Sequence, residues 1–355
     1  MPLTERENWF RAVRRTGPEW MPYEIHLGMA SWARYGREQE EVVLRHPRTW
    51  KRYQPGSYEE LLRKSWPPQE DPTRDFVDQW GSVWRTTQFG FVGTVVEQPL
   101  GTEEALRDFR APSAETYNGG QNPVNFAAER ERLARDRAEG RRARGGLDHG
   151  FFLLRLEYLR GFDNLMCDLM DPSDDFRRLF RTVHELNLGA VRNWLAAGAE
   201  TIGLPEDLGA QDRSIIGPRL FRRWALPCYK ELHALAHAGG ALTYFHCDGN
   251  ILDLCDQLRE IAPDVFNPQD RANGVENLAR ELKGRMCLDL DLDRQHILPF
   301  GTPREIEELV EHEVRLLGAP EGGLMMKVEA RGDVPPRNLE AVATALEKWS
   351  LFRTK

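Results

Sequence analysis

The stretch ALTYFHCDGNILDLCDQLREIAPDVFNP, residues 241–268, contains the repeating unit on which the fold prediction rests. Residues 241–247 form a short apolar run typical of a buried strand, and residues 249–263 have the spacing of an amphipathic helix. A second strand follows at residues 264–268. A strand, a helix and a second strand in this order predict two parallel strands joined by a covering helix.

The same alternation continues through the second half of the chain. Strand-like runs occur at residues 150–159, 199–205, 285–293 and 323–330, separated by helical stretches such as 172–198 and 217–240. An earlier strand is expected within residues 20–28. Six strands after residue 150 and one or two before it give about eight, the number in a closed (β/α)8 TIM barrel. A doubly wound open sheet is the alternative.

We expect a single domain over residues 1–355 with three additions to the barrel. Residues 1–20 contain a short amphipathic helix that begins after Thr4. Residues 76–100 are rich in aromatic and β-branched residues broken by glycines, which indicates a hairpin. Residues 120–148 are densely charged and predict a solvated helix or a mobile loop, with an anion-binding arm as the alternative.

Composition excludes several functional classes. The net charge of -8 and the pI near 5.7 argue against a general nucleic-acid binder. Five cysteines without close pairs indicate free thiols and a cytoplasmic location. The N-terminal residues lack an apolar signal region, and no apolar run reaches about 18 residues, so secretion and membrane insertion are not expected.

Polar residues gather where the expected strands end. In a (β/α)8 barrel the active site lies at the carboxyl ends of the strands, so these side chains are predicted to converge on one mouth. They are Glu157, Glu206, Asp207, His246, Asp248, Gln269, Asp289, Asp291, Asp293 and Glu329. For the last three aspartates, the alternative is that one faces the cavity and another caps the next helix.

His246 and Asp248 are the strongest candidates among these residues. Side chains alternate along a strand, so the two share one face while Cys247 points the other way as a packing residue. A histidine with carboxylates and an open position suits zinc or another divalent ion. The alternatives are a metal-free acid/base or substrate site, and a hydrogen-bonded core histidine followed by a turn. His233 and His237 are interpreted as ordinary packing or surface histidines.

Several motifs in a fixed order resemble the uroporphyrinogen decarboxylase superfamily, which includes the corrinoid-dependent methyltransferases. The motifs are WGSVW (80–84), GTVVEQPL (93–100), EDLGAQ (206–211), IIGPRLFRRWALPCYK (215–230), FHCDGNI (245–251), DLDRQHILPFGTPREI (291–306) and GDVPPRNLEA (332–341). The similarity spans most of the chain and is strongest from residue 150 onward. It implies a (β/α)8 barrel, in agreement with the strand count.

The resemblance implies different chemistry in its two branches. Porphyrinogen decarboxylases carry an Arg-Gln-Ala-Gly loop that binds propionates, but residues 22–30 here contain no arginine. A tetrapyrrole with many carboxylates needs such cations. The methyltransferases hold zinc with a His-x-Cys motif and a later cysteine. His246 matches that motif, whereas Asp248 replaces its cysteine and Glu329 lies near the place of the later one.

The resulting prediction is a methyltransferase linked to a corrinoid protein, acting on a small-molecule substrate. Zinc or another divalent metal is expected at His246, Asp248 and Glu329, and acid/base groups at Glu206, Asp289 and Asp291. Substrate contacts are expected from Glu157, Asp207, Gln211 and Gln269. The alternatives are a metal-free decarboxylase or lyase of a small carboxylated compound, and a non-catalytic barrel that binds a corrinoid or small ligand.

A homodimer is a further expectation, and it rests on the aromatic hairpin. Trp80, Trp84, Phe89 and Phe91 would pack across a dimer interface, where aromatic residues are enriched. Packing of the same residues inside the chain is the alternative.

Overall fold

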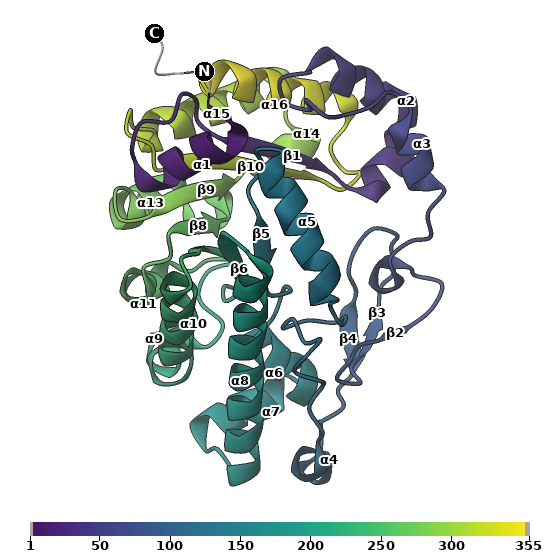
Figure 1. Ribbon diagram of the computed structural model, residues 1–355, viewed down its shortest axis with the longest axis vertical. Coiled ribbons are helices and arrows are strands. Elements are labelled where there is room, and N and C mark those ends of the chain that lie inside the picture. The colour runs from purple at the N-terminus through teal and green to yellow at the C-terminus, as the bar shows by residue number, and fades with distance from the viewer. Residues whose placement is uncertain (1–2, 352–355) are drawn as a thin grey trace.

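A computed structural model describes residues 3–351 as a TIM-barrel-like α/β fold (Figure 1). Seven parallel strands form one sheet in the order β1-β10-β9-β8-β7-β6-β5. Their bounds are β1 Tyr23–Leu27, β5 Arg144–Gly146, β6 Thr201–Asp207, β7 Leu242–Asp248, β8 Val265–Pro268, β9 Cys287–Asp291 and β10 Leu324–Ala330. The predicted barrel class is confirmed. Within residues 3–351 no strand pairs β1 with β5, and we call this gap the seam.

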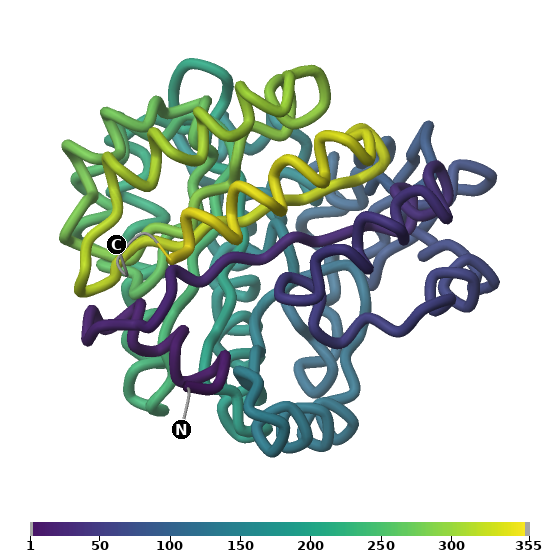
Figure 2. The backbone as a smooth tube through the Cα atoms, turned by 90° about the horizontal axis from the view of Figure 1, so that it is seen from above, coloured from purple at the N-terminus to yellow at the C-terminus, as the bar shows by residue number. Residues whose placement is uncertain are grey.

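Helices surround the sheet, and the two end segments of the described chain lie side by side. Figure 2 shows α16 beside the segment that leads into β1, and the Met21 amide donates to the Ser350 carbonyl at 2.9 Å. The principal helices are α1 Glu5–Arg14, α2 Met29–Arg45, α5 Phe126–Ala138, α6 Leu153–Arg160, α8 Asp174–Ala197, α10 Leu226–Ala238, α11 Cys255–Ile261, α13 Val275–Leu282, α15 Pro303–Leu317 and α16 Pro336–Trp349. Shorter ones are α3 Ser57–Leu62, α4 Glu103–Asp108, α7 Phe162–Met170, α9 Gly217–Leu220, α12 Asp270–Asn273 and α14 Ile297–Phe300.

Local capping signals set where several helices begin and end. Thr4 and Glu7 form a capping box at the start of α1, as the sequence predicts, and Thr302 with Glu305 does the same for α15. Ser173 caps α8, and Gly198 ends it with a positive φ of 95°. No helix among residues 3–351 has the length and apolar character needed to cross a bilayer.

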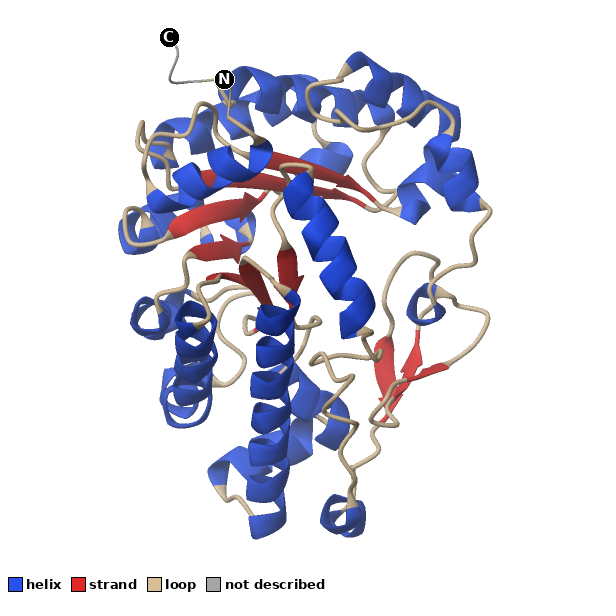
Figure 3. Cartoon of the chain, in the orientation of Figure 1, coloured by secondary structure: helices blue, strands red, loops and turns tan. Residues whose placement is uncertain are grey.

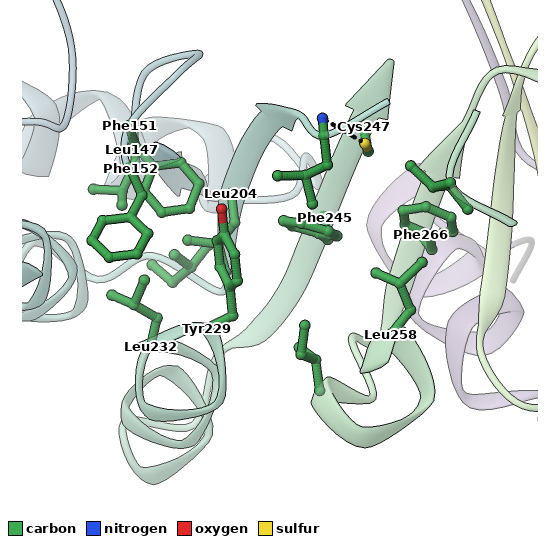
Figure 4. Packing of buried hydrophobic residues seen from close by; sticks show 14 of the residues in the cluster. Leu147, Phe151, Phe152, Leu204, Tyr229, Leu232, Phe245, Cys247, Leu258 and Phe266 are labelled. Atoms are coloured by element: carbon green, nitrogen blue, oxygen red, sulfur yellow. Dashed lines mark hydrogen bonds between the residues drawn. The ribbon is translucent and has the colours of Figure 1, made fainter. Parts of the chain in front are cut away.

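Figure 3 shows helices packed around the outside of the sheet, and the main hydrophobic core consists of buried side chains from both the strands and these helices. Phe245 and Phe266 project from β7 and β8 toward this layer and pack near Tyr229 of α10 (Figure 4). Cys247 points to the same side, where it accepts a hydrogen bond from the Leu208 amide at 3.2 Å. Its predicted packing role is confirmed, because the side chain is fully buried.

The inner face of the sheet is polar. Burial alternates residue by residue along β6 and β7, with the helix-facing side chains buried and the inward ones partly accessible. Tyr244 donates from β7 to Asp289 of β9 at 2.9 Å, and Lys327 of β10 lies 2.7 Å from Glu329. Charged and hydrogen-bonded side chains therefore occupy space that layers of branched apolar residues fill in most barrels of this kind.

One expectation about residues 120–159 needs correction. The strand expected at 150–159 is the helix α6, because a short apolar run has no periodicity that separates a buried strand from a buried helix. The barrel strand is instead β5, inside the charged segment that also forms the solvated helix α5. β5 contains two glycines because neighbours approach closely: a Cβ on Gly145 would lie 2.6 Å from the Trp194 ring.

The predicted hairpin region forms a separate antiparallel sheet of β2 Phe76–Val77, β3 Val83–Arg85 and β4 Thr94–Glu97. Trp80 and Trp84 are buried within the chain, so the core-packing alternative holds for them, whereas Phe89 is exposed. Asp78 accepts from the Trp80 and Ser82 amides and from the Trp84 indole. Its carboxylate also pairs with Arg155 of α6 at 2.6 Å, which ties the small sheet to the barrel.

Replacing Arg155 with methionine tests how much this tie contributes. Both side chains of the Asp78–Arg155 pair are 0% exposed, so the variant leaves a buried carboxylate without its cation. We expect the free energy of unfolding to fall by about 3–5 kcal/mol. Arg85→Met is the control because the Arg85–Asp75 pair is 56% and 38% exposed, so its removal should cost much less. Urea unfolding of both variants measures the difference, and equal losses would contradict the assignment.

Candidate active site at the barrel mouth

Charged and imidazole side chains meet at the carboxyl ends of the barrel strands. We call this group the mouth cluster; it consists of His149, Asp207, His246, Asp248, Asp291, Arg294 and Glu329. Its members come from the ends of β6, β7, β9 and β10 and from the loops that follow β5 and β9. The predicted convergence of strand ends on one site therefore brings together Asp207, His246, Asp248, Asp291 and Glu329.

Arg294 organises the acidic half of the mouth cluster. Its guanidinium contacts the Asp248 carboxylate, lies 3.2 Å from Asp291 Oδ2 and lies 3.5 Å from Glu329 Oε2. Glu329 also pairs with Lys327 and Arg331, each at 2.7 Å. One guanidinium thus neutralises carboxylates from three strands.

The acidic groups respond differently to this environment. Burial raises the pKa of Asp291 to about 6, although Arg294 opposes the shift. Burial alone would also raise the pKa of Asp248, but His246 and Arg294 outweigh it and lower the value to about 2. Lys327 and Arg331 likewise overcome burial and lower the pKa of Glu329. Asp291 is therefore the carboxyl group of the mouth cluster best placed to hold or release a proton near neutral pH.

The other half of the mouth cluster contains two histidines and a carboxylate. His149 Nε2 lies 3.0 Å from Asp207 Oδ1, and one ligand atom each of His149, Asp207 and His246 lies within 4.8 Å of the others. Burial opposes protonation of His149, but the Asp207 carboxylate outweighs it and raises the pKa of the imidazole. Two imidazoles and a carboxylate form a donor set that divalent transition metals accept.

Tight backbone packing positions the end of β7. Gly249 has a positive φ of 79°, and a Cβ there would lie 2.0 Å from the Gly209 carbonyl oxygen. Its amide donates to the Gln269 side-chain oxygen at 2.9 Å. The glycine that follows Asp248 therefore allows the loops after β6 and β7 to touch, and Gln269 holds the second loop in place.

The structure does not bring the three predicted metal ligands together as one set of ligand atoms. Arg294 contacts both Asp248 and Glu329, and therefore takes the place of the cation that the sequence assigns to a metal. His246, Asp248 and Glu329 are not among the groups of the described chain whose ligand atoms come within reach of one ion. Of the three predicted ligands, His246 alone belongs to such a group, with His149 and Asp207.

Besides Gln269, five other predicted residues lie outside the mouth cluster. Glu206 is 0% exposed and faces the outer layer, where it accepts from the Leu153 amide at 2.9 Å and the Tyr229 hydroxyl at 2.5 Å. Glu157 lies in α6, Gln211 is exposed in the loop after β6, and Asp289 lies deeper in the barrel with Tyr244. Asp293 accepts from the His296 amide at 3.0 Å in the turn before α14, but it does not cap that helix as one sequence alternative proposed.

Glu206 is a structural group by this geometry. Burial raises its pKa to about 7, while its bonds to Tyr229 and to the first amides of α6 oppose that shift. Asp207, the next residue along β6, faces the mouth instead. Because side chains alternate along a strand, applying this rule to β6 would have predicted that Glu206 and Asp207 face opposite sides of the sheet.

The sequence interpretation missed His149 and Arg294. His149 follows β5, and the strand-end rule would have identified it once the glycine strand was recognised. Arg294 follows the acidic carboxyl end of β9. The sequence interpretation considered only the acidic residues there and did not include this arginine. A cation beside three carboxylates is nevertheless what burial of those groups requires.

A second group of possible metal ligands lies away from the mouth. His233, His237 and Asp264 also bring their ligand atoms within 4.8 Å of one another. His233 bonds with the Thr243 hydroxyl at 2.8 Å, and His237 bonds with Asp264 at 2.7 Å. These bonds join α10 to the amino ends of β7 and β8, which agrees with the predicted packing role.

The fold and the mouth cluster define an α/β barrel protein with a charged site at the carboxyl ends of its strands. The family model of Uroporphyrinogen decarboxylase (URO-D) matches residues 92–349, and the chain belongs to this family. A search of curated protein sequences finds no match.

Among solved structures, a methyltransferase from Methanosarcina mazei is similar over 98% of this chain and 99% of its own, with a TM-score of 0.67 and 12% identity. A sugar phosphate isomerase/epimerase from Parabacteroides distasonis matches at a TM-score of 0.36, with 11% identity over 66% of this chain and 82% of its own. At these identities the likeness to the methyltransferase shows a shared fold over the full length of both chains.

Replacing Arg294 with methionine tests its role in the mouth cluster. Without the guanidinium the pKa of Asp291 rises above its present value of about 6, so ionising this buried carboxyl becomes more costly. At pH 5 the Asp291 carboxyl group is protonated in both proteins. At pH 8 it ionises beside the Arg294 guanidinium in the wild type, whereas the variant has no cation there. We expect the loss of thermal stability to be larger at pH 8 than at pH 5.

Arg271→Met provides the matched control. Arg271 is 55% exposed and pairs with Asp293 at 3.1 Å, outside the mouth cluster. Asp293 is 5% exposed but keeps its hydrogen bonds from the Gln295 and His296 amides, so the loss of stability on removing Arg271 should not grow between the two pH values. A loss for Arg294→Met that is the same at both pH values would contradict the coupling to Asp291.

Proposed function

We propose that this protein is a methyltransferase that works with a corrinoid protein carrying the methyl group. The observation that carries the proposal is the pairing of a two-histidine, one-carboxylate group with an arginine-organised acidic group at one barrel mouth. Membership of the URO-D family and the resemblance to its methyltransferase branch support this assignment. The corrinoid protein would present its methyl group at this mouth.

We further propose that His149, Asp207 and His246 hold a divalent metal, with zinc as the first candidate. Both ring nitrogens of His246 face oxygen acceptors: Nδ1 lies 2.8 Å from Asn267 Oδ1, and Nε2 lies 3.2 Å from Asp248 Oδ1. If Nδ1 donates to Asn267, Nε2 presents a lone pair toward a carboxylate, an arrangement that a cation stabilises. A hydrogen bond to the second nitrogen is also the usual partner of a metal-binding histidine.

The donor set favours a particular class of substrate. A metal bound there supplies Lewis-acid polarisation or activation of a nucleophile. The ligands are nitrogen and oxygen atoms, and burial raises the pKa of the nearby Cys247 thiol well above its usual value. We therefore propose transfer of the methyl group to or from an oxygen or nitrogen atom of a small polar compound.

The chain's own residues would manage the proton that accompanies this transfer. Asp291 has one carboxylate oxygen without a hydrogen-bond partner among the described residues, and its pKa is about 6. Arg294 holds Asp291 and Asp248 in fixed positions relative to each other. Asp291 would accept or donate the proton, and Arg294 would keep the carboxylates oriented toward the bound substrate.

Decarboxylation of a small carboxylated compound is the second candidate function. Asp291 favours this reaction, because a carboxyl group with a pKa of about 6 can protonate the carbanion that remains after carbon dioxide leaves. In this case the reaction needs no corrinoid. Carbon dioxide release in the absence of any corrinoid would support this function over methyl transfer.

The methyltransferase proposal is tested with methylcobalamin as the methyl source. We expect the purified protein to speed demethylation of methylcobalamin when oxygen or nitrogen compounds are supplied, as followed by the visible spectrum of the corrinoid. Asp291→Asn should reduce this rate at least tenfold, because the amide cannot exchange the proton. Demethylation that never exceeds the rate without protein, across such compounds, would overturn the proposal.

The metal proposal is tested separately by zinc titration. The wild type should bind one zinc ion tightly, and His149→Ala and His246→Ala should each weaken binding by at least about tenfold, because each removes one ligand. Isothermal titration calorimetry and elemental analysis measure affinity and stoichiometry.

His233→Ala is the matched control, because it disrupts the other group of two histidines and an aspartate. It should leave the tight site unchanged. If His233→Ala loses zinc and His149→Ala retains it, the metal binds at the group of His233, His237 and Asp264. The metal part of the proposal would then be wrong.

A further inference from the structure

A cavity of about 600 Å³ lies at the end of the barrel opposite the mouth cluster, beside the seam. Its walls come from α1, the start of β1, residues 48–51, the segment that joins α5 to β5, and the start of β10. Figure 1 shows α1 and α5 near this end of the sheet. The volume falls within the range of small-molecule sites.

The charged residues that line the cavity leave a positive surplus. Six are cationic and four are acidic: Arg6, Arg48, Lys51, Arg141, Arg142 and Arg144 against Glu5, Glu24, Asp136 and Asp289. Each acidic group already has a partner. Lys51 pairs with Glu5 at 3.0 Å, Arg144 with Glu24 at 3.2 Å, and Arg141 with Asp136 at 2.6 Å, while Tyr244 donates to Asp289. Arg6 pairs with Glu200, which does not line the cavity, at 2.5 Å. The lining cations without a carboxylate within 4.0 Å among residues 3–351 are therefore Arg48 and Arg142.

Arg142 is the central cation of this surplus. Among residues 3–351 no carboxylate oxygen lies within 4.0 Å of its guanidinium nitrogens. The guanidinium instead lies over the Trp9 ring, 3.9 Å from its centroid. Stacking on an aromatic face leaves the hydrogen-bonding edge of the group available.

Arg144 lies beside Arg142 and spans the seam. The two residues are two positions apart at the start of β5, and both line the cavity. Arg144 of β5 and Glu24 of β1 remain 51% and 55% exposed, because their side chains face this space. Two guanidinium groups side by side match the paired oxygens of a carboxylate or a phosphate.

The remaining wall is apolar and aromatic. Trp20, Tyr23, Ile25, Met325 and Met326 line it together with Trp9. Such a wall favours a ligand with an apolar body next to its charged group.

We propose that this cavity is a second ligand site, which binds a small organic anion. Arg142 and Arg144 hold its carboxylate or phosphate group, and the apolar body lies against Trp9 and the two methionines. The proposal does not depend on the function of the mouth cluster.

The electrostatics of the cavity agree with this assignment. Burial and the neighbouring charge of Arg144 lower the pKa of Arg142 to about 9, so the guanidinium stays charged at neutral pH but lacks a compensating anion. A bound anion would supply that compensation. Binding should therefore also raise the melting temperature of the protein.

Calorimetric titration with benzoate, phenyl phosphate and benzyl alcohol tests the proposal. These probes share an aromatic ring and differ in their charged group. We expect one or both anions to bind with a Kd below about 1 mM, benzyl alcohol to bind at least tenfold more weakly, and Arg142→Met to weaken anion binding at least tenfold. A preference between benzoate and phenyl phosphate distinguishes a carboxylate from a phosphate ligand.

Three further variants separate binding from folding. Arg142→Lys keeps the charge and should retain part of the affinity. Arg48→Met removes an exposed cation of the cavity and should weaken binding several-fold without loss of the fold, whereas Arg304→Met removes an arginine outside the cavity and should change nothing. Failure of both anions to bind the wild type, equal binding of benzyl alcohol, or wild-type affinity in Arg48→Met and any folded Arg142→Met would overturn the proposal.

Discussion

The charged inner face of the sheet is the constraint on which the rest of this structure depends. A buried carboxylate or guanidinium without a partner is strongly destabilising, so each charge inside the barrel needs a counter-charge or a hydrogen bond. Arg294 meets this need for Asp248, Asp291 and Glu329 at the mouth, and Arg155 meets it for Asp78 beside the barrel. The positions of the inner side chains are therefore set by pairing more than by apolar packing.

A polar interior leaves the outer layer to provide most of the hydrophobic stabilisation. Phe245 and Phe266 alternate with the inner residues of their strands and pack against the helices, with Cys247 in the same layer. Glu206 faces this layer too, and its carboxylate caps the start of α6 instead of reaching the mouth. Strand alternation thus decides which acidic groups are available for chemistry and which hold helices in place.

The same alternation determines how much could be predicted from the sequence. Strands with an apolar outer face, such as β7 and β9, can be recognised from their sequence pattern. Their positions then predict where His246, Asp248 and Asp291 lie. β5 could not be found this way, because two of its three residues are glycines and carry no hydrophobic pattern. Because β5 was not predicted, His149 was not recognised as a strand-end residue. The apolar run of α6 was predicted as a strand instead.

Partnerships between distant residues were also beyond the sequence pattern. Arg294 follows β9, but its contacts with Asp248 and Glu329 depend on where β7 and β10 lie in the folded sheet. A sequence pattern describes each residue within its own strand and contains no information about neighbours from other strands. The predicted metal set of His246, Asp248 and Glu329 did not take this arginine into account, because its contacts with two of these residues are not visible in the sequence.

Asp248 connects the two halves of the mouth cluster. One of its oxygens lies 3.2 Å from His246 Nε2, and the other contacts Arg294. A neutral thiol at this position could not hold the guanidinium as a carboxylate does, and a thiolate would compete with Asp291 and Glu329 for the same cation. The aspartate that replaces the cysteine of the resembled zinc motif and the arginine beside it therefore form one unit. In the proposed function, this unit would favour oxygen and nitrogen chemistry over thiolate chemistry at the mouth.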